Sequence, residues 1–198
     1  MGGVPADRVH LVRHGESTWN LQRRLQGQTA HPPLTGRGRE QAARAAATLR
    51  RLVAGPVRLL SSDLIRARQT ADILAGTLGV EVHERAELRE QALGALEGRL
   101  TRELRAQPVP AGLDVTEVRW GGGESIADVH ARVGLLLAEV ALWPVPDIVL
   151  VTHGDTLRVA LAVLEGRGHR EVAWEVVGNG EVVTRSLGNP FGTPAPGR

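Results

Sequence analysis

Two histidines, each followed by a glycine, come directly after apolar runs of this 198-residue chain. His14 follows residues 9–12 with Arg13 between them, and His153 follows residues 147–152. Short apolar runs of this kind are typical of buried strands, and open α/β sheets bind ligands beyond the carboxyl ends of such strands. The pattern therefore predicts one site at the edge of a sheet, built around two imidazoles and a guanidinium.

An imidazole beside arginines suits chemistry on a phosphate monoester, which needs a nucleophile, compensation of negative charge and a proton for the leaving oxygen. His14 can act as the nucleophile, because imidazole is largely neutral at pH 7 and forms a covalent phosphoryl adduct. Arg13 and Arg66 can each hold phosphoryl oxygens through two N–H groups, which a lysine cannot do. Arg66 is also expected in the first turn of a helix, where backbone N–H groups add to an anion site.

The elements that position these side chains are predicted to alternate between strands and helices. The expected strands are the short apolar runs at residues 9–12, 57–60, 80–82 and 148–152. The expected helices cover residues 37–53, 64–78, 97–105, 126–140 and 156–164. This alternation predicts a three-layer α/β/α sandwich with a mostly parallel central sheet.

Caps and turns refine this prediction. Thr35 is expected to cap the first long helix, and Ser125 to cap the helix whose apolar residues recur every three or four positions. The helix that stops at Gly79 is expected to be capped by one of Ser61, Ser62 and Asp63. A terminal hairpin is predicted from residues 171–177 and 181–187 around the turn at 178–180.

The length of the chain indicates a single domain, residues 1–188, with a short cap segment within about 95–123. Residues 189–198 are rich in proline and glycine and are expected to be a disordered tail. The absence of cysteine excludes disulfides, thiolate metal sites and cysteine nucleophiles. No apolar run approaches the ~18 residues of a membrane span and no signal core is seen, so we expect a cytoplasmic protein without a membrane partner.

The sequence pI of 10.6 contrasts with a formal net charge of only +2. The chain has no lysine, tyrosine or cysteine, so almost nothing titrates between histidine and arginine. The high pI therefore reflects missing buffering groups and not a strong positive field. For this reason no nucleic-acid partner is expected.

Residues 11–20 resemble the leading motif of the histidine phosphatase superfamily, in its phosphoglycerate mutase-like branch. Further segments resemble the blocks that follow in this family, in the same order: Leu34-Thr35-Gly36, residues 61–71, Leu88-Arg89-Glu90, Gly123-Glu124-Ser125 and Val151-Thr152-His153-Gly154. The resemblance covers residues 8–188 and implies the phosphoglycerate mutase-like sandwich. It also implies a phosphomonoester phosphatase that works through a phosphohistidine on His14.

Glu90 is the residue that the resemblance selects as general acid and base. It would protonate the leaving alkoxide and then activate the water that hydrolyses the phosphohistidine. By residue type alone, Glu84, Glu87 and Glu97 are rival candidates for this role. Only the position of Glu90 in the family's pattern distinguishes it from them.

The resemblance also implies residues that bind the phosphate. His153 would donate to a phosphoryl oxygen, and Gly154 would let the backbone come close to it. Asn20 and Gln26 occupy positions where the family places polar contacts to phosphate, although loop amides of this kind also serve as caps. The arginines left as solvated or substrate-rim residues are Arg23, Arg24 and Arg119.

No metal is expected, because the seven histidines show no ligand spacing such as His-Glu-x-x-His. The two arginines would provide the positive charge that Mg²⁺ provides in kinases. No cofactor is expected for a phosphatase, whereas a phosphoglycerate mutase would need 2,3-bisphosphoglycerate to prime His14. A catalytically silent module that binds a phospholigand is the third alternative.

The segment between Glu90 and Gly123 is short, whereas mutases that resemble this branch carry a long insertion there that closes over the site. A more open pocket admits water, which favours a phosphatase over a mutase. The expected partner is a small phosphomonoester substrate, and the chain itself is expected to be a monomer or a homodimer. Residues 99–120 are expected to form the cap that selects the substrate, with apolar contacts available from Leu104, Val109, Leu113, Val115 and Val118.

Overall fold

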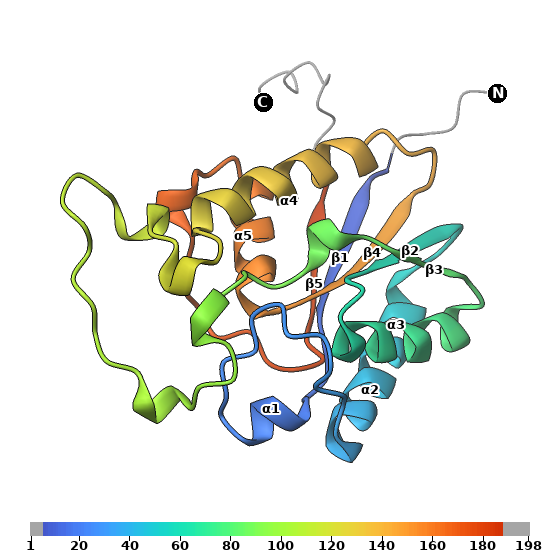
Figure 1. Cartoon of the computed structure of the whole chain (residues 1–198). Coiled ribbons are helices and arrows are strands. Elements are labelled where there is room, and N and C mark those ends of the chain that lie inside the picture. The colour runs from blue at the N-terminus through green and yellow to red at the C-terminus, as the bar shows by residue number, and fades with distance from the viewer. Residues whose placement is uncertain (1–5, 188–198) are drawn as a thin grey trace.

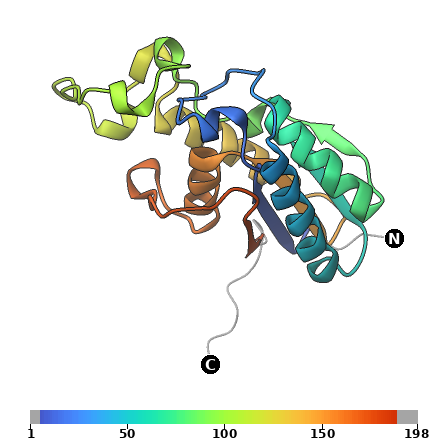
Figure 2. The ribbon, with the colours of Figure 1, turned by 90° about the horizontal axis from the view of Figure 1, so that it is seen from below.

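Residues 6–187 are the part of the chain that the computed structural model describes. They form a five-stranded sheet in the order β3-β2-β4-β1-β5, with helices on both faces (Figures 1 and 2). The strands are β1 (Arg8–Arg13), β2 (Val57–Ser61), β3 (Val82–Glu84), β4 (Asp147–Thr152) and β5 (Val182–Ser186). The α-helices are α1 (Thr18–Leu21), α2 (Gly36–Leu52), α3 (Ile65–Leu78), α4 (Ile126–Val140) and α5 (Gly154–Leu164).

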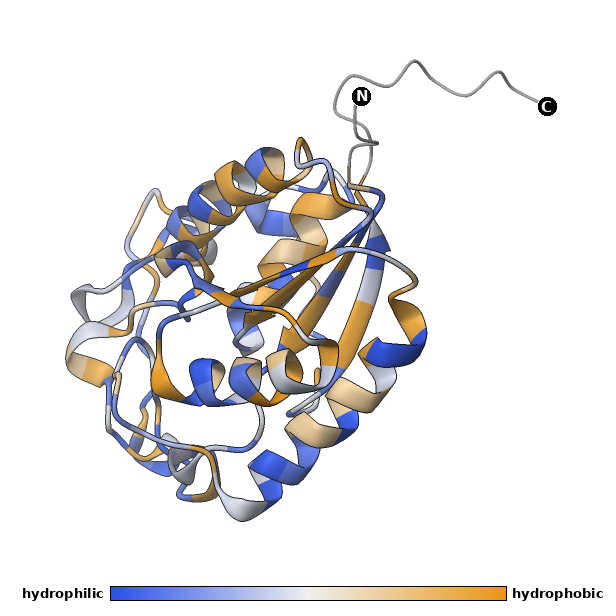
Figure 3. Cartoon of the chain, turned by 90° about the vertical axis from the view of Figure 1, so that its right-hand side faces the viewer, coloured by the Kyte–Doolittle hydropathy of each residue, from blue (hydrophilic) through white to orange (hydrophobic). Residues whose placement is uncertain are grey.

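Four strands of the sheet run parallel, and β5 joins the free edge of β1 in the antiparallel direction. Successive side chains of a strand point to opposite faces. In β4, Leu150 packs in the core under α4 and α5, whereas Val149 and Val151 pack in the core under α2 and α3. Figure 3 shows the mostly apolar strands between helices that carry both apolar and polar stripes. The predicted three-layer α/β/α sandwich is confirmed.

The ends of the long helices are set by the residues that the sequence indicated. The hydroxyl of Thr35 accepts the N–H of Gly38 at the start of α2 (3.0 Å). Ser125 caps α4 through a reciprocal pair of bonds with Asp128. Gly79 ends α3 in the left-handed conformation that favours glycine. The predicted apolar stripe of α4 is buried, namely Ile126, Val129, Val133, Leu136 and Val140.

The predicted cap of α3 was wrong. Leu64 occupies the capping position, and no side chain caps the first turn there. The candidates are engaged elsewhere, since Ser62 binds His153 and Asp63 pairs with Arg89. The polar residues before α3 therefore serve the site and a loop contact instead of the helix end.

The helix predicted at residues 97–105 was also wrong, since only a single 3₁₀ turn forms there, at Thr101–Glu103. The backbone bonds to an earlier loop instead. The N–H of Gly98 donates to the carbonyl of Leu25 (2.8 Å), and the N–H of Leu25 donates to the carbonyl of Arg99 (2.9 Å). These cross-chain bonds replace the local bonds that a helix would need.

The hairpin predicted around residues 178–180 does not form. Only its second half is a strand, and this strand, β5, pairs with β1. The first half is held by side chains, because Arg13 donates to the carbonyl of Val177 and Arg158 to that of Glu175. Pairing of β5 with β1 and anchoring of residues 175–177 by arginines therefore replace the predicted hairpin.

Two smaller outcomes complete the comparison with the sequence. β3 covers Val82–Glu84, two residues later than predicted, and the tail predicted at 189–198 lies outside the described residues. Residues 107–123 are irregular apart from short 3₁₀ turns. In the described part of the chain, no helix has the length and apolar composition needed to cross a membrane.

We expect Ser125→Ala to lower the free energy of unfolding by about 1 kcal/mol, the usual cost of losing an N-cap. The buried hydroxyl accepts the N–H of Asp128 (3.1 Å), which would lose its partner. Denaturant unfolding followed by circular dichroism measures the change. Thr77→Ala is the control, because this exposed hydroxyl bonds only to a carbonyl of its own helix. Equal losses in both variants would contradict the capping role.

Candidate active site

The carboxyl ends of β1 and β4 place the two histidines side by side. The strands pair in register, with Arg13 opposite Thr152. The residue that follows each strand is a histidine. The ring centroids of His14 and His153 lie 5.0 Å apart in an edge-to-face arrangement. Both rings are buried. The structure thus brings together the two strand ends that the sequence pattern singled out.

A cavity of about 160 Å³ opens beside these rings. It is lined by seven of the eight predicted site residues: Arg13, His14, Asn20, Gln26, Arg66, Glu90 and Gly154. His153 is the exception, because it packs against His14 without lining the cavity. The other residues that line it are Arg24, Leu25, Gly27, Leu93, Asp155 and Arg158.

His14 is held as a neutral imidazole with one free nitrogen. Its Nδ1 lies 2.7 Å from the carbonyl oxygen of Gly15, and a carbonyl can only accept, so Nδ1 carries the proton. The lone pair is therefore on Nε2. Burial and the positive charges of Arg66 and Arg13 lower the pKa of His14 well below its usual value of 6.5. This is the protonation state that a nucleophilic histidine requires.

His153 is held by Ser62 through a hydrogen bond that its ring accepts, whereas the ring of His14 donates. The hydroxyl of Ser62 lies 2.9 Å from Nε2 of His153, and the same hydroxyl accepts the N–H of Leu64 (3.3 Å). The hydroxyl is then free to donate to Nε2, which leaves the proton of His153 on Nδ1. Among the described residues, this buried Nδ1 has no hydrogen-bond partner. Burial, followed by the charges of Arg66 and His14, lowers the pKa of His153 as well.

Two buried arginines supply positive charge to the cavity. Arg66 is anchored by the carbonyls of Thr29 and Gly27, both at 2.8 Å. Arg13 is anchored by the carbonyl of Val177. Each guanidinium keeps a buried Nε without a partner among the described residues. Burial lowers the pKa of Arg66 to about 10 and also lowers that of Arg13. Both guanidiniums stay protonated at pH 7, because arginine is not deprotonated in proteins.

Glu90 lies at the N-terminus of α5, where its carboxylate accepts the backbone N–H groups of Asp155 (3.2 Å) and Thr156 (3.1 Å). The hydroxyl of Thr156 donates to the same carboxylate (3.1 Å). Among the described residues, Glu90 is the one glutamate that lines the cavity. The rival candidates bind elsewhere: Glu84 to Arg68, Glu87 to Arg85, and Glu97 to the N–H groups of Gln28 and Leu93.

The two predicted amides line the cavity through the loop after β1. Ser17 donates its N–H to Oδ1 of Asn20 (3.0 Å) and its hydroxyl to Oε1 of Gln26 (2.7 Å). Both amide oxygens are therefore engaged with the loop itself. The amide nitrogens remain as the ends that could donate to an anion.

Arg132 on α4 supports the loop that carries Glu90, a role that the sequence gave no sign of. Its guanidinium donates to the carbonyls of Glu87 (2.6 Å) and Glu90 (3.1 Å) and pairs with Glu124 (2.9 Å). Glu124 in turn accepts the side chain of Gln28 and the N–H of Ala92. Glu124 belongs to the motif Gly123-Glu124-Ser125, but only the structure shows that Arg132 on α4 is its partner.

Three charged residues of the cavity were missed or set aside at the sequence level. Arg24 was left as a solvated or substrate-rim residue, yet it lines the cavity and donates to the carbonyl of Gly98 (2.7 Å). Asp155 and Arg158 form an ion pair at 2.7 Å on α5. Burial and the charge of Glu90 raise the pKa of Asp155 to about 6. The sequence contained a sign of Asp155 and Arg158, because both follow His153 within the first turns of the predicted helix.

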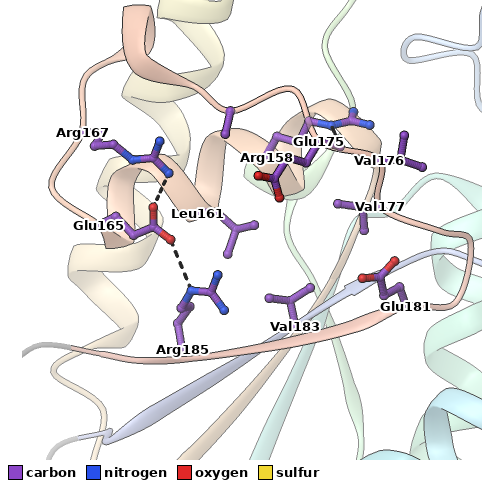
Figure 4. A pocket seen from close by; sticks show the side chains of 11 residues that line it. Arg158, Leu161, Glu165, Arg167, Glu175, Val176, Val177, Glu181, Val183 and Arg185 are labelled. Atoms are coloured by element: carbon purple, nitrogen blue, oxygen red, sulfur yellow. Dashed lines mark hydrogen bonds and ion pairs between the residues drawn. The ribbon is translucent and has the colours of Figure 1, made fainter.

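A separate cavity of about 460 Å³ lies between α5, β5 and the segment before it (Figure 4). Within its walls, Glu165 binds both Arg167 and Arg185. Arg158 is the residue that borders both this cavity and the candidate site. Across residues 6–187, no group of three or more His, Cys, Asp or Glu side chains is arranged to hold a metal ion.

Comparison with known proteins identifies similar sequences. The model of the histidine phosphatase superfamily (branch 1) matches residues 9–188. A probable phosphoglycerate mutase GpmB of Citrobacter koseri is 38% identical over 167 residues, which are 80% of this chain and 75% of that protein. The corresponding protein of Salmonella paratyphi C is 36% identical over 164 residues, with the same coverage.

Solved structures are similar as well. A mycobacterial glucosyl-3-phosphoglycerate phosphatase in complex with VO₃ has a TM-score of 0.78 and 33% identity, and the match covers 90% of this chain and 92% of that one. The protein TTHB049 from Thermus thermophilus has a TM-score of 0.68 and 34% identity, with 89% and 92% covered.

We expect His14 and His153 to stay neutral at pH 6, each with its proton on Nδ1. Nitrogen-15 NMR of the imidazoles measures this, and the urea-unfolded chain is the control, with all histidines titrating near about 6.5. Below pH 6.5 the unfolded chain then binds protons that the folded chain does not bind. The contribution of these histidines to the free energy of unfolding should therefore be fully present above pH 6.5. As the pH decreases below 6.5, the free energy of unfolding should decrease by up to about 1.4 kcal/mol per pH unit for each histidine. Titration of either ring near 6.5 in the folded protein would refute the assignment.

We expect Arg132→Met to lower kcat by about 10- to 100-fold with little change in KM, because it would release the loop of Glu90 and leave the arginines of the cavity in place. Steady-state kinetics on a phosphate monoester measure both constants. Arg119→Met is the matched control, since Arg119 forms an exposed pair with Asp128 away from the cavity. A similar loss of kcat in both variants would mean that Arg132 has no special role.

Proposed function

The chain belongs to the histidine phosphatase superfamily (branch 1), and on this basis we propose that it is a phosphomonoester phosphatase working through a phosphohistidine on His14. The observation that carries the proposal is the buried His14 itself. Its Nδ1 is tied to a carbonyl, its pKa is lowered, and its neighbours at the cavity are two protonated arginines. A neutral nucleophile beside fixed positive charge is what attack on a phosphate dianion needs.

In the first step, Nε2 of His14 forms a bond to phosphorus while the bond to the ester oxygen breaks. Arg13 and Arg66 hold the phosphoryl oxygens and offset their charge, and Nδ1–H of His153 donates to one of them. The leaving oxygen takes a proton from Glu90, which has first taken this proton up from water. The products are the free alcohol and phospho-His14.

In the second step, water attacks the phosphorus of phospho-His14. The carboxylate of Glu90 takes a proton from this water, and the bond from phosphorus to Nε2 breaks. Inorganic phosphate leaves, while His14 returns to its neutral form and Glu90 to its acid form. Each proton that Glu90 gives in the first step is thus recovered in the second.

A phosphoglycerate mutase is the second candidate, because the curated relatives named above are called probable phosphoglycerate mutases. Such an enzyme would return the phosphoryl group from His14 to a second position of its substrate. Two observations favour the phosphatase. The segment between Glu90 and Gly123 is short, and a structural relative covering nine tenths of the chain is named a phosphatase.

We further propose that the reaction needs no metal ion. Two buried guanidiniums can supply the positive charge that a divalent cation supplies elsewhere. The proposal also draws on the chemistry of the lining residues, which offer nitrogen donors and few carboxylates to a ligand. Chelators provide the test.

We expect phosphate release from p-nitrophenyl phosphate in excess EDTA, with none from His14→Ala and a loss of at least about 100-fold in Arg66→Ala. His130→Ala is the control, because His130 lies on α4 outside the cavity and binds the carbonyl of Arg167. Near-normal release by His14→Ala would sink the phosphohistidine mechanism. Isomerisation of 3-phosphoglycerate that depends on the bisphosphate primer, without phosphate release, would establish the mutase instead.

A further inference from the structure

A further cavity, of about 520 Å³, shares a wall with the cavity beside His14, which we call the phosphate cavity under the function proposed above. The two cavities have three lining residues in common, Leu25, Leu93 and Asp155. The larger space therefore lies next to the position of a phosphate held near His14. We call this larger space the cap cavity; its other lining residues are Leu96, Arg99, Glu103, Leu104, Arg105, Ala106, Gln107 and Trp120.

Apolar side chains dominate the cap cavity. Four leucines and one tryptophan form its walls, namely Leu25, Leu93, Leu96, Leu104 and Trp120. Two arginines and two carboxylates also border it, and one of these carboxylates, Asp155, is already paired with Arg158, which lies outside the cap cavity. The cavity thus offers a ligand mainly apolar contact.

Glycines allow two backbone segments beside the cap cavity to approach each other closely. A Cβ atom on Gly121 would lie 2.2 Å from the carbonyl oxygen of Leu93, and one on Gly123 would lie 2.0 Å from that of Ala92. Neither position can carry a larger residue without moving backbone. The run of glycines after Trp120 therefore lets that residue approach the segment of Leu93 closely, which fixes two opposite parts of the cavity relative to each other.

We propose that the cap cavity binds the leaving group of the substrate, and that this group is an alcohol with an apolar aliphatic or aromatic body of several carbon atoms. This proposal rests on the phosphatase function proposed above. Apolar surface that leaves water on binding favours the larger leaving group, by roughly threefold in affinity for each methylene that enters the cavity. The selection comes from the apolar area of the cavity.

Of the five apolar residues that the sequence offered as cap contacts, only Leu104 lines the cavity. Val118 is buried elsewhere, and the other three, Val109, Leu113 and Val115, are exposed. Leu104 and Leu113 make a matched pair, because both belong to the cap and they are 37% and 48% exposed. Only the first of them should influence the choice of leaving group.

The test is kcat/KM for the n-alkyl phosphates from ethyl to octyl, with inorganic phosphate as the readout. We expect kcat/KM of the wild type to rise roughly threefold per methylene until the cavity is filled. Leu104→Ser and Trp120→Ala should flatten this rise, whereas Leu113→Ser should keep it. Each variant is compared with itself along the series, so a general loss of activity cancels.

Binding of the n-alkyl phosphonates, measured by calorimetry, separates the cavity from the chemistry, because phosphonates are not hydrolysed. Turnover of every ester at the same rate, with phosphonate affinity independent of chain length, would overturn the cap cavity and leave the phosphatase standing. Phosphonate affinity that rises with chain length, without phosphate release from any ester, would overturn the phosphatase and support the cavity. An equal flattening in Leu113→Ser would overturn the role of Leu104.

Discussion

Parallel hydrogen bonding between β1 and β4 brings Arg13 opposite Thr152, and the placement of the two histidines of the candidate site depends on this register. The two residues beyond it, His14 and His153, then have to lie side by side. A shift by one residue would turn alternate side chains to the other face of the sheet and separate the rings. The register is well specified because both faces of β4 are buried in apolar cores.

Arg13 from β1 and Arg66 from α3 bring buried positive charge together beside these rings, which is costly without a partner. Arg13 and Arg66 are protonated, and their carbonyl partners offset only part of the cost of burial. The two imidazoles respond by remaining neutral, as their lowered pKa values show. Three buried N–H groups at or beside the cavity have no partner among the described residues, those of the two guanidiniums and of His153. Unpaired donors of this kind support the proposal that the cavity binds an anion.

The sequence predicted the sandwich and most of its elements because periodicity and caps are local properties, as Ser125 and Gly79 show. It also predicted seven residues of the cavity, since strand ends and a recognisable motif carry most of them. It failed where distant contacts decide the outcome. Residues 97–105 bond to the loop of Leu25 instead of forming a helix, and Arg132 reaches Glu90 from another layer of the fold.

The two adjoining cavities are built from different kinds of structure. The phosphate cavity combines residues at the ends of strands and helices, such as Arg13, His14 and Gly154, with loop residues such as Gln26 and Glu90. The cap cavity is built from loops whose backbone is tied down at a few points, such as the bonds of Leu25 to Gly98 and Arg99. Loops tolerate substitution better than strands do. Under the proposed function, a change of lining in the cap would therefore alter the leaving group that fits, while the register of β1 and β4 would keep His14 and His153 side by side.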